Sequence, residues 1–286
     1  MSFPSKFDYV SPQSLEEVSA FLYKNEGAKI LAGGHELIPL LKKRNVNTGL
    51  LVDLKNIKSL KQIRINEEDN SLVIGSMVSC DDLISFLDHE YSCPALMQAA
   101  KSVGDAQVRN WTTIGGNIAS GNPAADLAAP LQCLDAKVNL IGHNGRREVN
   151  MDQFFVGPFE TALEKDEVID SIHIPYQEGT ILSGYEKIKI AANSYPLCGV
   201  AMLLVKQESG KIQDGRIAIT GASIHPRRLY KAEALINGRK ANSKRLLLAV
   251  LENHDNVMYL SDEFGSSEYR RHMTQVLVEN LLNRLV

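Results

Sequence analysis

Two glycine pairs are the part of this sequence whose composition and spacing point most directly to chemistry. Gly33-Gly34 follows a short apolar segment, and Gly115-Gly116 lies at the start of a stretch rich in small residues. Glycine lets a backbone approach a ligand closely, and successive N–H groups in such a turn form a concave nest for phosphate oxygens. One Gly-Gly pair alone is more often an ordinary turn. Two such loops, however, could hold a diphosphate from both sides.

The familiar nucleotide and metal motifs are absent from the sequence. There is no G-x-x-x-x-G-K-[ST] and no G-x-G-x-x-G after a predicted strand, so a dinucleotide would have to be held in another way. The histidines show no metal-ligand spacing, and no C-x-x-C spacing links the cysteines, which are Cys80, Cys93, Cys133 and Cys198. We therefore expect buried or half-buried thiols and no metal centre on this chain.

The composition is that of an ordinary folded protein. Its 286 residues suggest about two domains, and 44% hydrophobic with 23% charged residues is typical of globular chains. The formal net charge of −3 argues against a nucleic-acid partner. No apolar run approaches the roughly 18 residues that a membrane span needs, and the first residues contain no apolar signal core. These observations predict a cytoplasmic location.

The elements that must position the first glycine pair alternate between helix and strand. Ser14 and Glu17 form a capping box in front of a helical apolar pattern. The Asn144-Gly145 pair predicts a hairpin turn. Strands are expected over residues 28–31, 50–54, 72–76 and 137–141, and a helix over 80–87.

The pattern changes near residue 176, where strands come first and helices follow. Strands are expected over residues 185–190, 199–206 and 216–221, with a turn at 213–215. Helices are expected over residues 229–236, 243–251 and 269–285. We therefore place a domain boundary near residue 176 and predict an α+β fold.

Several segments resemble the FAD-binding medium subunits of the molybdenum hydroxylases. Residues 32–42 and 107–117 look like the two flavin loops of that family, and residues 122–126 (NPAAD) follow at its usual offset. Further similar segments cover nearly the whole chain, at residues 7–12, 166–175, 222–228 and 268–271. The family includes subunits of carbon monoxide, bacterial xanthine and nicotinate dehydrogenases. His35 and the Leu-Ile-Pro after it are most similar to the carbon monoxide dehydrogenase branch.

The resemblance implies an architecture, a cofactor and partners. A two-part FAD-binding domain of the vanillyl-alcohol-oxidase/PCMH type would span residues 1–176, with subdomains of about 1–56 and 57–176. A smaller α+β domain of the carbon monoxide dehydrogenase flavoprotein type would span 177–286. FAD would be bound non-covalently. The molybdenum cofactor and two [2Fe–2S] clusters would lie only on a large molybdopterin subunit and a small iron–sulfur subunit, in a heterotrimer or its dimer.

The resemblance also implies which residues contact FAD. Asp126 would lie near the ribityl or adenosine side, and Val103 and Ile169 would pack against the cofactor. Lys187, in a register that Glu186 could also occupy, would contact the flavin edge or a phosphate, and Tyr195 would lie beside the isoalloxazine ring. The backbone of two segments would wrap the diphosphate, and Asn117 would add a side-chain contact. The first segment is Leu31, Ala32, Gly33, Gly34, His35, Glu36, Leu37 and Ile38, and the second is Thr113, Ile114, Gly115, Gly116 and Asn117.

Some of these residues have a second interpretation. Asp126 could cap a helix that begins at Leu127, and Tyr195 could be an ordinary core or half-buried tyrosine. Arg109 and the pair Arg227-Arg228 could be solvated surface charges, which is the commoner fate of arginine. Histidine also occurs at the position of His35 in flavoproteins whose flavin is covalently attached.

The function implied is that of an oxidoreductase subunit. FAD on this chain would take electrons from the [2Fe–2S] clusters and pass them to NAD, a quinone or another acceptor, and no side chain of the chain is required as a general acid or base. One alternative is a stand-alone flavin oxidase of the vanillyl-alcohol-oxidase type, for which the C-terminal part offers no clear catalytic base. The other is a flavin-free scaffold, against which the intact glycines of both loops argue.

Overall fold

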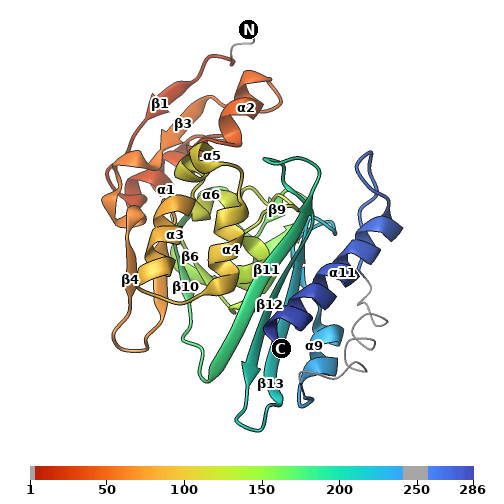
Figure 1. The fold of residues 1–286 in the computed structure, drawn as a ribbon. Helices are drawn as coiled ribbons and strands as arrows, with labels where there is room; N and C mark the ends of the chain where they lie inside the picture. Colours follow the sequence, from red (N-terminus) through yellow and green to blue (C-terminus); the bar gives the residue numbers. More distant parts are fainter. Residues whose placement is uncertain (1–3, 241–256) are drawn as a thin grey trace.

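The computed structural model describes residues 4–240 and 257–286, and its strands form four sheets with helices packed on them (Figure 1). The predicted helix over 243–251 lies outside the described residues. A small three-stranded parallel sheet has the order β1-β3-β2, with β1 at Asp8–Val10, β2 at Lys29–Leu31 and β3 at Leu50–Asp53. Helix α1 (Leu15–Lys24) buries Val18 and Leu22 against this sheet, and α2 (Leu37–Lys42) follows β2.

The central sheet is antiparallel, with the order β4-β5-β10-β6-β7. Its strands are β4 (Ile63–Ile65), β5 (Leu72–Gly75), β6 (Lys137–Gly142), β7 (Gly145–Asn150) and β10 (Val168–Ile174). The helices that share its core are α3 (Cys80–His89), α4 (Pro94–Ser102), α5 (Ala106–Trp111), α6 (Ile114–Ala119), α7 (Ala128–Cys133) and the single turn α8 (Met151–Phe154). Short strands β8 (Phe155–Gly157) and β9 (Glu160–Thr161) pair with each other. The 3-10 turns η1 (Leu54–Asn56) and η2 (Lys58–Lys61) connect the two sheets.

The third main sheet is antiparallel and has helices on both faces. Its order is β11-β12-β13-β14, from β11 (Thr180–Lys189), β12 (Pro196–Lys206), β13 (Ile212–Thr220) and β14 (Arg227–Arg228). Helices α4 and α7 pack on one face, while α9 (Tyr230–Ile236) and α11 (Ser267–Leu285) cover the other (Figure 1). Strand β12 is therefore buried along almost its whole length, which explains its unbroken run of apolar residues.

Most of the expected elements are present, and the α+β prediction is confirmed. Ser14 caps α1 by accepting a bond from the Glu17 N–H, and Asn144-Gly145 joins β6 to β7. The Glu17 carboxylate accepts from the Gln13 N–H, one residue earlier than in a standard capping box. All four cysteines are buried and free, and burial raises the pKa of Cys80 to about 12 and that of Cys93 to about 11.

Two local predictions are wrong. Residues 213–215 lie inside β13, and the chain turns instead at Glu208-Ser209. Gly115 and Gly116 lie in the first turn of α6, not in a loop, because the Thr113 side chain caps that helix by accepting from the Gly116 N–H.

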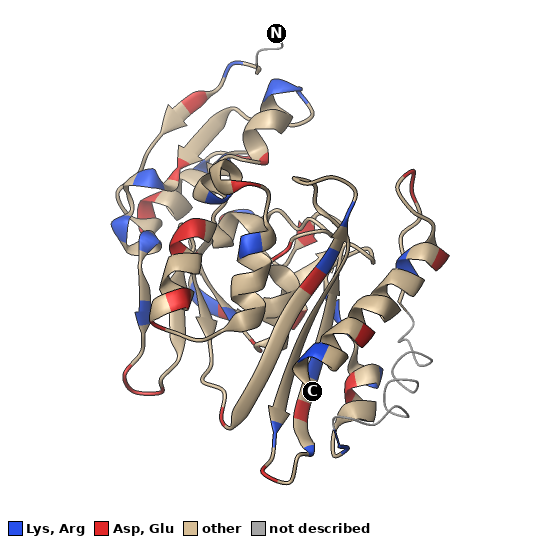
Figure 2. Ribbon diagram, in the orientation of Figure 1, with Lys and Arg blue, Asp and Glu red and all other residues tan. Residues whose placement is uncertain are grey.

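Charges of both signs are interspersed over the chain (Figure 2). Among the described residues, no helix is long and apolar enough to cross a membrane. Within the same ranges, no group of three or more histidine, cysteine, aspartate or glutamate side chains is arranged to hold a metal ion.

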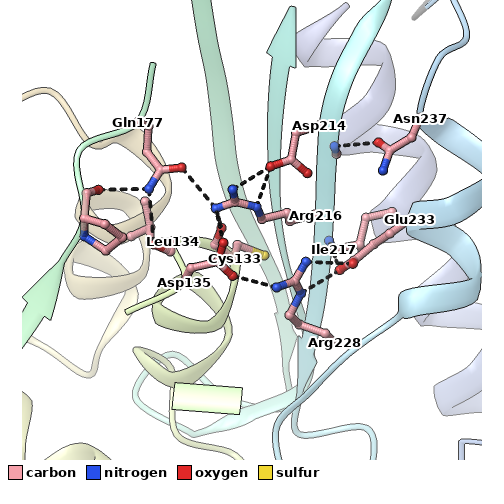
Figure 3. Close-up of polar contacts among 12 residues, drawn as sticks. Cys133, Leu134, Asp135, Gln177, Asp214, Arg216, Ile217, Arg228, Glu233 and Asn237 are labelled. Atoms are coloured by element: carbon pink, nitrogen blue, oxygen red, sulfur yellow. Dashed lines mark hydrogen bonds and ion pairs between the residues drawn. The ribbon is translucent and has the colours of Figure 1, made fainter. Parts of the chain in front are cut away.

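An ion-pair network joins the third sheet to the end of α7 (Figure 3). Asp135, which adopts a left-handed backbone conformation, forms ion pairs with Arg216 of β13 and Arg228 of β14. Arg228 also pairs with the buried Glu233 of α9 at 2.8 Å, and Arg216 donates to the Gln177 side chain. Arg228 is thus not the solvated surface charge considered above, because only 13% of its side chain is exposed.

Candidate functional site

A cavity of about 790 Å³ lies where the two glycine segments meet. Its volume falls within the range of small-molecule and cofactor pockets, about 300–1,000 Å³. The walls come from the β2–α2 loop, from α5 and α6, from β10 and from the loop after β11. Residues far apart in the sequence therefore combine to form one concave site.

The two glycine segments touch each other through the backbone. A Cβ atom on Gly33 would lie 1.6 Å from the Trp111 carbonyl oxygen, so only glycine permits this approach. Gly34 has a φ of +75°, a backbone conformation that glycine adopts without strain. Glycine is therefore required at position 33 by the close contact between the two walls, and it is favoured at position 34 by the backbone conformation of the turn.

The first segment presents backbone donors. In the part of the chain that the structure describes, the N–H groups of residues 33–36 have no acceptor, whereas the Ile38 N–H donates to the Gly34 carbonyl. Consecutive free N–H groups at a loop that leads into a helix make a nest for an anion. This part of the wall fits a phosphate group.

The backbone of the second segment is already bonded within the chain. The Ile114 N–H donates to Val78, that of Gly115 to Ser76 and that of Asn117 to Thr113, all at 2.9 Å. The Gly116 N–H donates to the Thr113 hydroxyl. The expectation that these N–H groups wrap a diphosphate therefore does not fit the geometry. What this segment offers the cavity is the small Gly116 surface and the NH₂ group of the Asn117 side chain, whose oxygen accepts from the Leu127 N–H.

Asp126 lies in the cavity wall and is only 2% exposed. Its Oδ1 atom accepts from the Tyr185 hydroxyl and from Lys187 Nζ, both at 2.8 Å. Burial raises the pKa of Asp126, and the Lys187 ammonium opposes that rise. The helix-cap alternative is wrong, because α7 begins at Ala128 and Asp126 makes no cap bond.

The loop between β11 and β12 closes one side of the cavity. Tyr195 lies in the wall and is exposed over 45% of its surface, so it is not a core tyrosine. Burial, with the nearby Glu36 carboxylate, raises its pKa to about 12. In the same loop the Asn193 amide donates to Asp105, the residue that caps α5. The loop is thus bonded to the wall that it faces.

The segment that carries Asp126 is fixed by the third sheet. The Thr220 hydroxyl of β13 lies 2.9 Å from the carbonyl oxygens of both Pro123 and Ala125. The Gly221 N–H donates to the same Pro123 carbonyl at 2.8 Å. This wall of the cavity consequently depends on residues almost 100 positions later in the chain.

The structure brings most of the predicted residues together. Those in the cavity wall are Ala32, Gly33, Gly34, His35, Glu36, Leu37, Val103, Thr113, Gly115, Gly116, Asn117, Asp126, Ile169 and Tyr195. Four others, Leu31, Ile38, Ile114 and Lys187, do not line it. Of the two neighbouring residues considered on β11, Lys187 reaches Asp126, whereas Glu186 pairs with Arg284 of α11.

Other wall residues escaped prediction from the sequence. They include Ser76, Trp111, Thr112 and Phe159. Trp111 directly precedes the Thr-Thr-Ile-Gly-Gly segment, so proximity to that motif was a usable signal, whereas nothing marks Phe159. Arg109 is not a solvated charge, because it pairs with Asp81 at 3.1 Å and its side chain is 22% exposed.

Comparisons with known proteins cover nearly the whole chain. Residues 5–177 match the FAD binding domain in molybdopterin dehydrogenase, and residues 183–285 match the CO dehydrogenase flavoprotein C-terminal domain. The carbon monoxide dehydrogenase medium chain of Hydrogenophaga pseudoflava is 35% identical over 98% of this chain and 97% of its own length. The glyceraldehyde dehydrogenase medium chain of Sulfolobus acidocaldarius is 33% identical over 96% of both chains. In the structure of reconstituted CO dehydrogenase from Oligotropha carboxidovorans, one chain superposes with a TM-score of 0.93 at 32% identity, covering 99% of this chain and 98% of that one.

Proposed function

The chain belongs to the family of FAD-binding medium subunits of molybdenum-containing dehydrogenases, and from that premise we propose that it relays electrons within a multisubunit complex. FAD would lie in the cavity between the glycine segments and the Tyr195 loop, without a covalent bond to His35. Electrons would arrive from [2Fe–2S] clusters on a small subunit, after substrate oxidation at a molybdenum site on a large one. The electrons would then pass from FAD to NAD, a quinone or another acceptor.

The observation that carries this proposal is the nest of free N–H groups at residues 33–36 inside the cavity. These donors suit the diphosphate of FAD, which supplies acceptor oxygens and negative charge. The apolar side chains of Val103 and Ile169 suit a flat aromatic ring system. The residues present therefore fit FAD.

Each wall of the cavity would contribute a different part of cofactor binding. The isoalloxazine ring supplies the redox chemistry, since it can exchange one or two electrons. Residues 33–36 would hold the diphosphate, Gly116 would leave it room, and Asp126 would accept a bond from a hydroxyl or N–H group. Tyr195 would cover one side of the ring and limit its contact with water.

The direct test is the visible spectrum of the purified protein together with acid precipitation. We expect flavin bands at about 370 and 450 nm, one FAD per chain, and all of the flavin in the supernatant after precipitation. Flavin that stays with the precipitate would refute the non-covalent site. A protein that has no bands and binds no added FAD would refute the proposal and favour the flavin-free scaffold.

Two further measurements address the partners and the other alternative. Co-expression with a large molybdopterin protein and a small cysteine-rich protein from neighbouring genes should give a complex that co-purifies through a tag on this chain. In that complex, a substrate of the large subunit should bleach the flavin bands. Bleaching of the isolated chain by a small organic substrate would instead indicate the stand-alone oxidase.

A further inference from the structure

Asp126, Tyr185 and Lys187 form a buried polar cluster at one wall of the cavity, called here the Asp126 cluster. We propose that Tyr185 and Lys187 are positioning residues, which hold one oxygen of the Asp126 carboxylate and leave the other to accept a hydrogen bond from FAD. This inference rests on the proposed function. It differs from the expectation that Lys187 contacts the cofactor itself.

The hydrogen-bond pattern divides the two carboxylate oxygens. Tyr185 and Lys187 both donate to Oδ1 at 2.8 Å, and the Ser102 hydroxyl lies 3.3 Å from the same atom. The single hydroxyl hydrogen of Ser102 has a better acceptor in the Ala99 carbonyl at 2.7 Å. Among the described residues, no donor reaches Oδ2. Since Asp126 lines the cavity, this oxygen is the acceptor that remains for a ligand.

The position of Lys187 argues that it acts through Asp126. Its side chain is only 4% exposed, and the residue is not part of the cavity wall. Both charges are buried, and an isolated buried carboxylate takes up a proton instead of staying charged. The Lys187 ammonium opposes the rise in the pKa of Asp126 that burial causes, and so favours the ionised form of the carboxylate. Tyr185, Lys189, Tyr195 and Cys80 are further titratable groups near this pair.

Tyr185 is built into the same strand with little freedom. Tyr185 and Lys187 are two residues apart on β11, so both side chains extend from the same face. The partner of Lys187 on β12 is Gly199, where a Cβ atom would lie 2.5 Å from the Tyr185 hydroxyl oxygen. A glycine at this position leaves the room that the Tyr185 hydroxyl needs to reach Asp126.

The chemistry of a carboxylate restricts what it can bind. An ionised carboxylate only accepts hydrogen bonds, and it repels a diphosphate. The matching groups of FAD are its sugar and ribityl hydroxyls and its ring N–H groups. The Asp126 cluster would therefore fix the orientation of FAD, with the diphosphate at residues 33–36 and a neutral donor at Asp126.

The experiment is a double-mutant cycle on the FAD dissociation constant of the full chain, stripped of cofactor and titrated with FAD. D126N should weaken binding by about 10- to 100-fold, the effect of losing a hydrogen bond to a charged group. K187M should weaken it to a similar extent, and K187R should recover part of the loss. Y185F should weaken it less than K187M does. The decisive expectation is that neither K187M nor Y185F adds a further loss to D126N.

The matched control is S183A, which lies on the same strand and removes a bond to the Ala95 N–H without touching Asp126. It should leave the FAD dissociation constant unchanged. If K187M weakens FAD binding equally in the wild-type and D126N backgrounds, Lys187 contacts FAD directly and the inference is overturned. A Y185F protein that melts at a lower temperature yet binds FAD normally would also overturn it. Should K187M fail to fold, the D126N/K187M protein, in which the Asp126 cluster carries no charge, still compares with D126N. A wild-type chain that binds no FAD at all would instead overturn the proposed function.

Discussion

The substitution Gly116→Val tests the cavity assignment most directly. Gly116 lies in the first turn of α6 with ordinary helical geometry, so a valine can adopt its backbone conformation. An added Cβ would lie 2.8 Å from the Thr113 hydroxyl and 3.6 Å from the Ala32 Cβ atom. The two further methyl groups would extend from there into the space between the glycine segments, where the proposal places the diphosphate.

The expected effect on the fold is small and the effect on binding is large. Valine is a better helix former than glycine by a few tenths of a kcal/mol, and overpacking costs about 1–3 kcal/mol. The net cost of the substitution therefore remains below the typical unfolding free energy of about 5–15 kcal/mol. A displaced diphosphate, however, would lose two or more charge-assisted bonds to residues 33–36, at about 1.5–3 kcal/mol each. The FAD dissociation constant should therefore rise by at least about 100-fold.

The assay is the ratio of flavin absorbance to protein absorbance after purification, followed by titration with FAD. G49V is a suitable control, because a Cβ atom at Gly49 would meet nothing within 4 Å. Its flavin content should equal that of the wild type. A folded G116V protein that retains one FAD per chain would refute the placement of the diphosphate beside Gly116.

Three further predictions use other features of the structure. Trp111 is the only tryptophan and lines the cavity. Its fluorescence should fall as FAD is titrated, because flavin absorbs at the wavelengths where tryptophan emits. Unchanged emission at saturating FAD would contradict the cavity assignment. T220V should lower the unfolding free energy by about 1–3 kcal/mol, since the Thr220 hydroxyl hydrogen, shared between the Pro123 and Ala125 carbonyls, is lost. A urea midpoint equal to that of the wild type would show that this hydroxyl contributes nothing. Arg270 lowers the pKa of Asp262, so the stability that this ion pair contributes should be present above the ordinary pKa of the carboxyl and lost as the pH falls through the lowered one. The D262N protein should lack this part of the pH dependence, as measured by denaturation at a series of acidic pH values.

Helices and strands with clear local signals were predictable. The Ser14 cap, the Asn144-Gly145 turn and the buried strand over 199–206 each carry their information within a few residues. The error at 213–215 arose because Asp214 and Gly215 are typical of turns, whereas here tertiary pairing with Val205 and Leu204 of β12 keeps them extended.

The candidate site was predictable in part and for a different reason. Glycine pairs and their neighbours could be identified because a close backbone approach tolerates few other residues. The N–H groups of the second segment were misjudged, since the acceptors of Ile114 and Gly115 are the Val78 and Ser76 carbonyls, which lie in the turn between β5 and α3. The contact of Lys187 with Asp126 likewise joins residues about 60 positions apart, and no local pattern reports such a distance.

The support that Thr220 and Gly221 give to residues 123 and 125 has a consequence for how the protein is made. A ribosome releases the glycine segments well before β13, and domains generally begin to fold from the N-terminal side during synthesis. The Asp126 wall, however, acquires its anchoring bonds only after the chain has been extended past residue 221. Cofactor loading should therefore come late in biosynthesis, and a stalled chain that already contains both glycine pairs would not yet hold FAD.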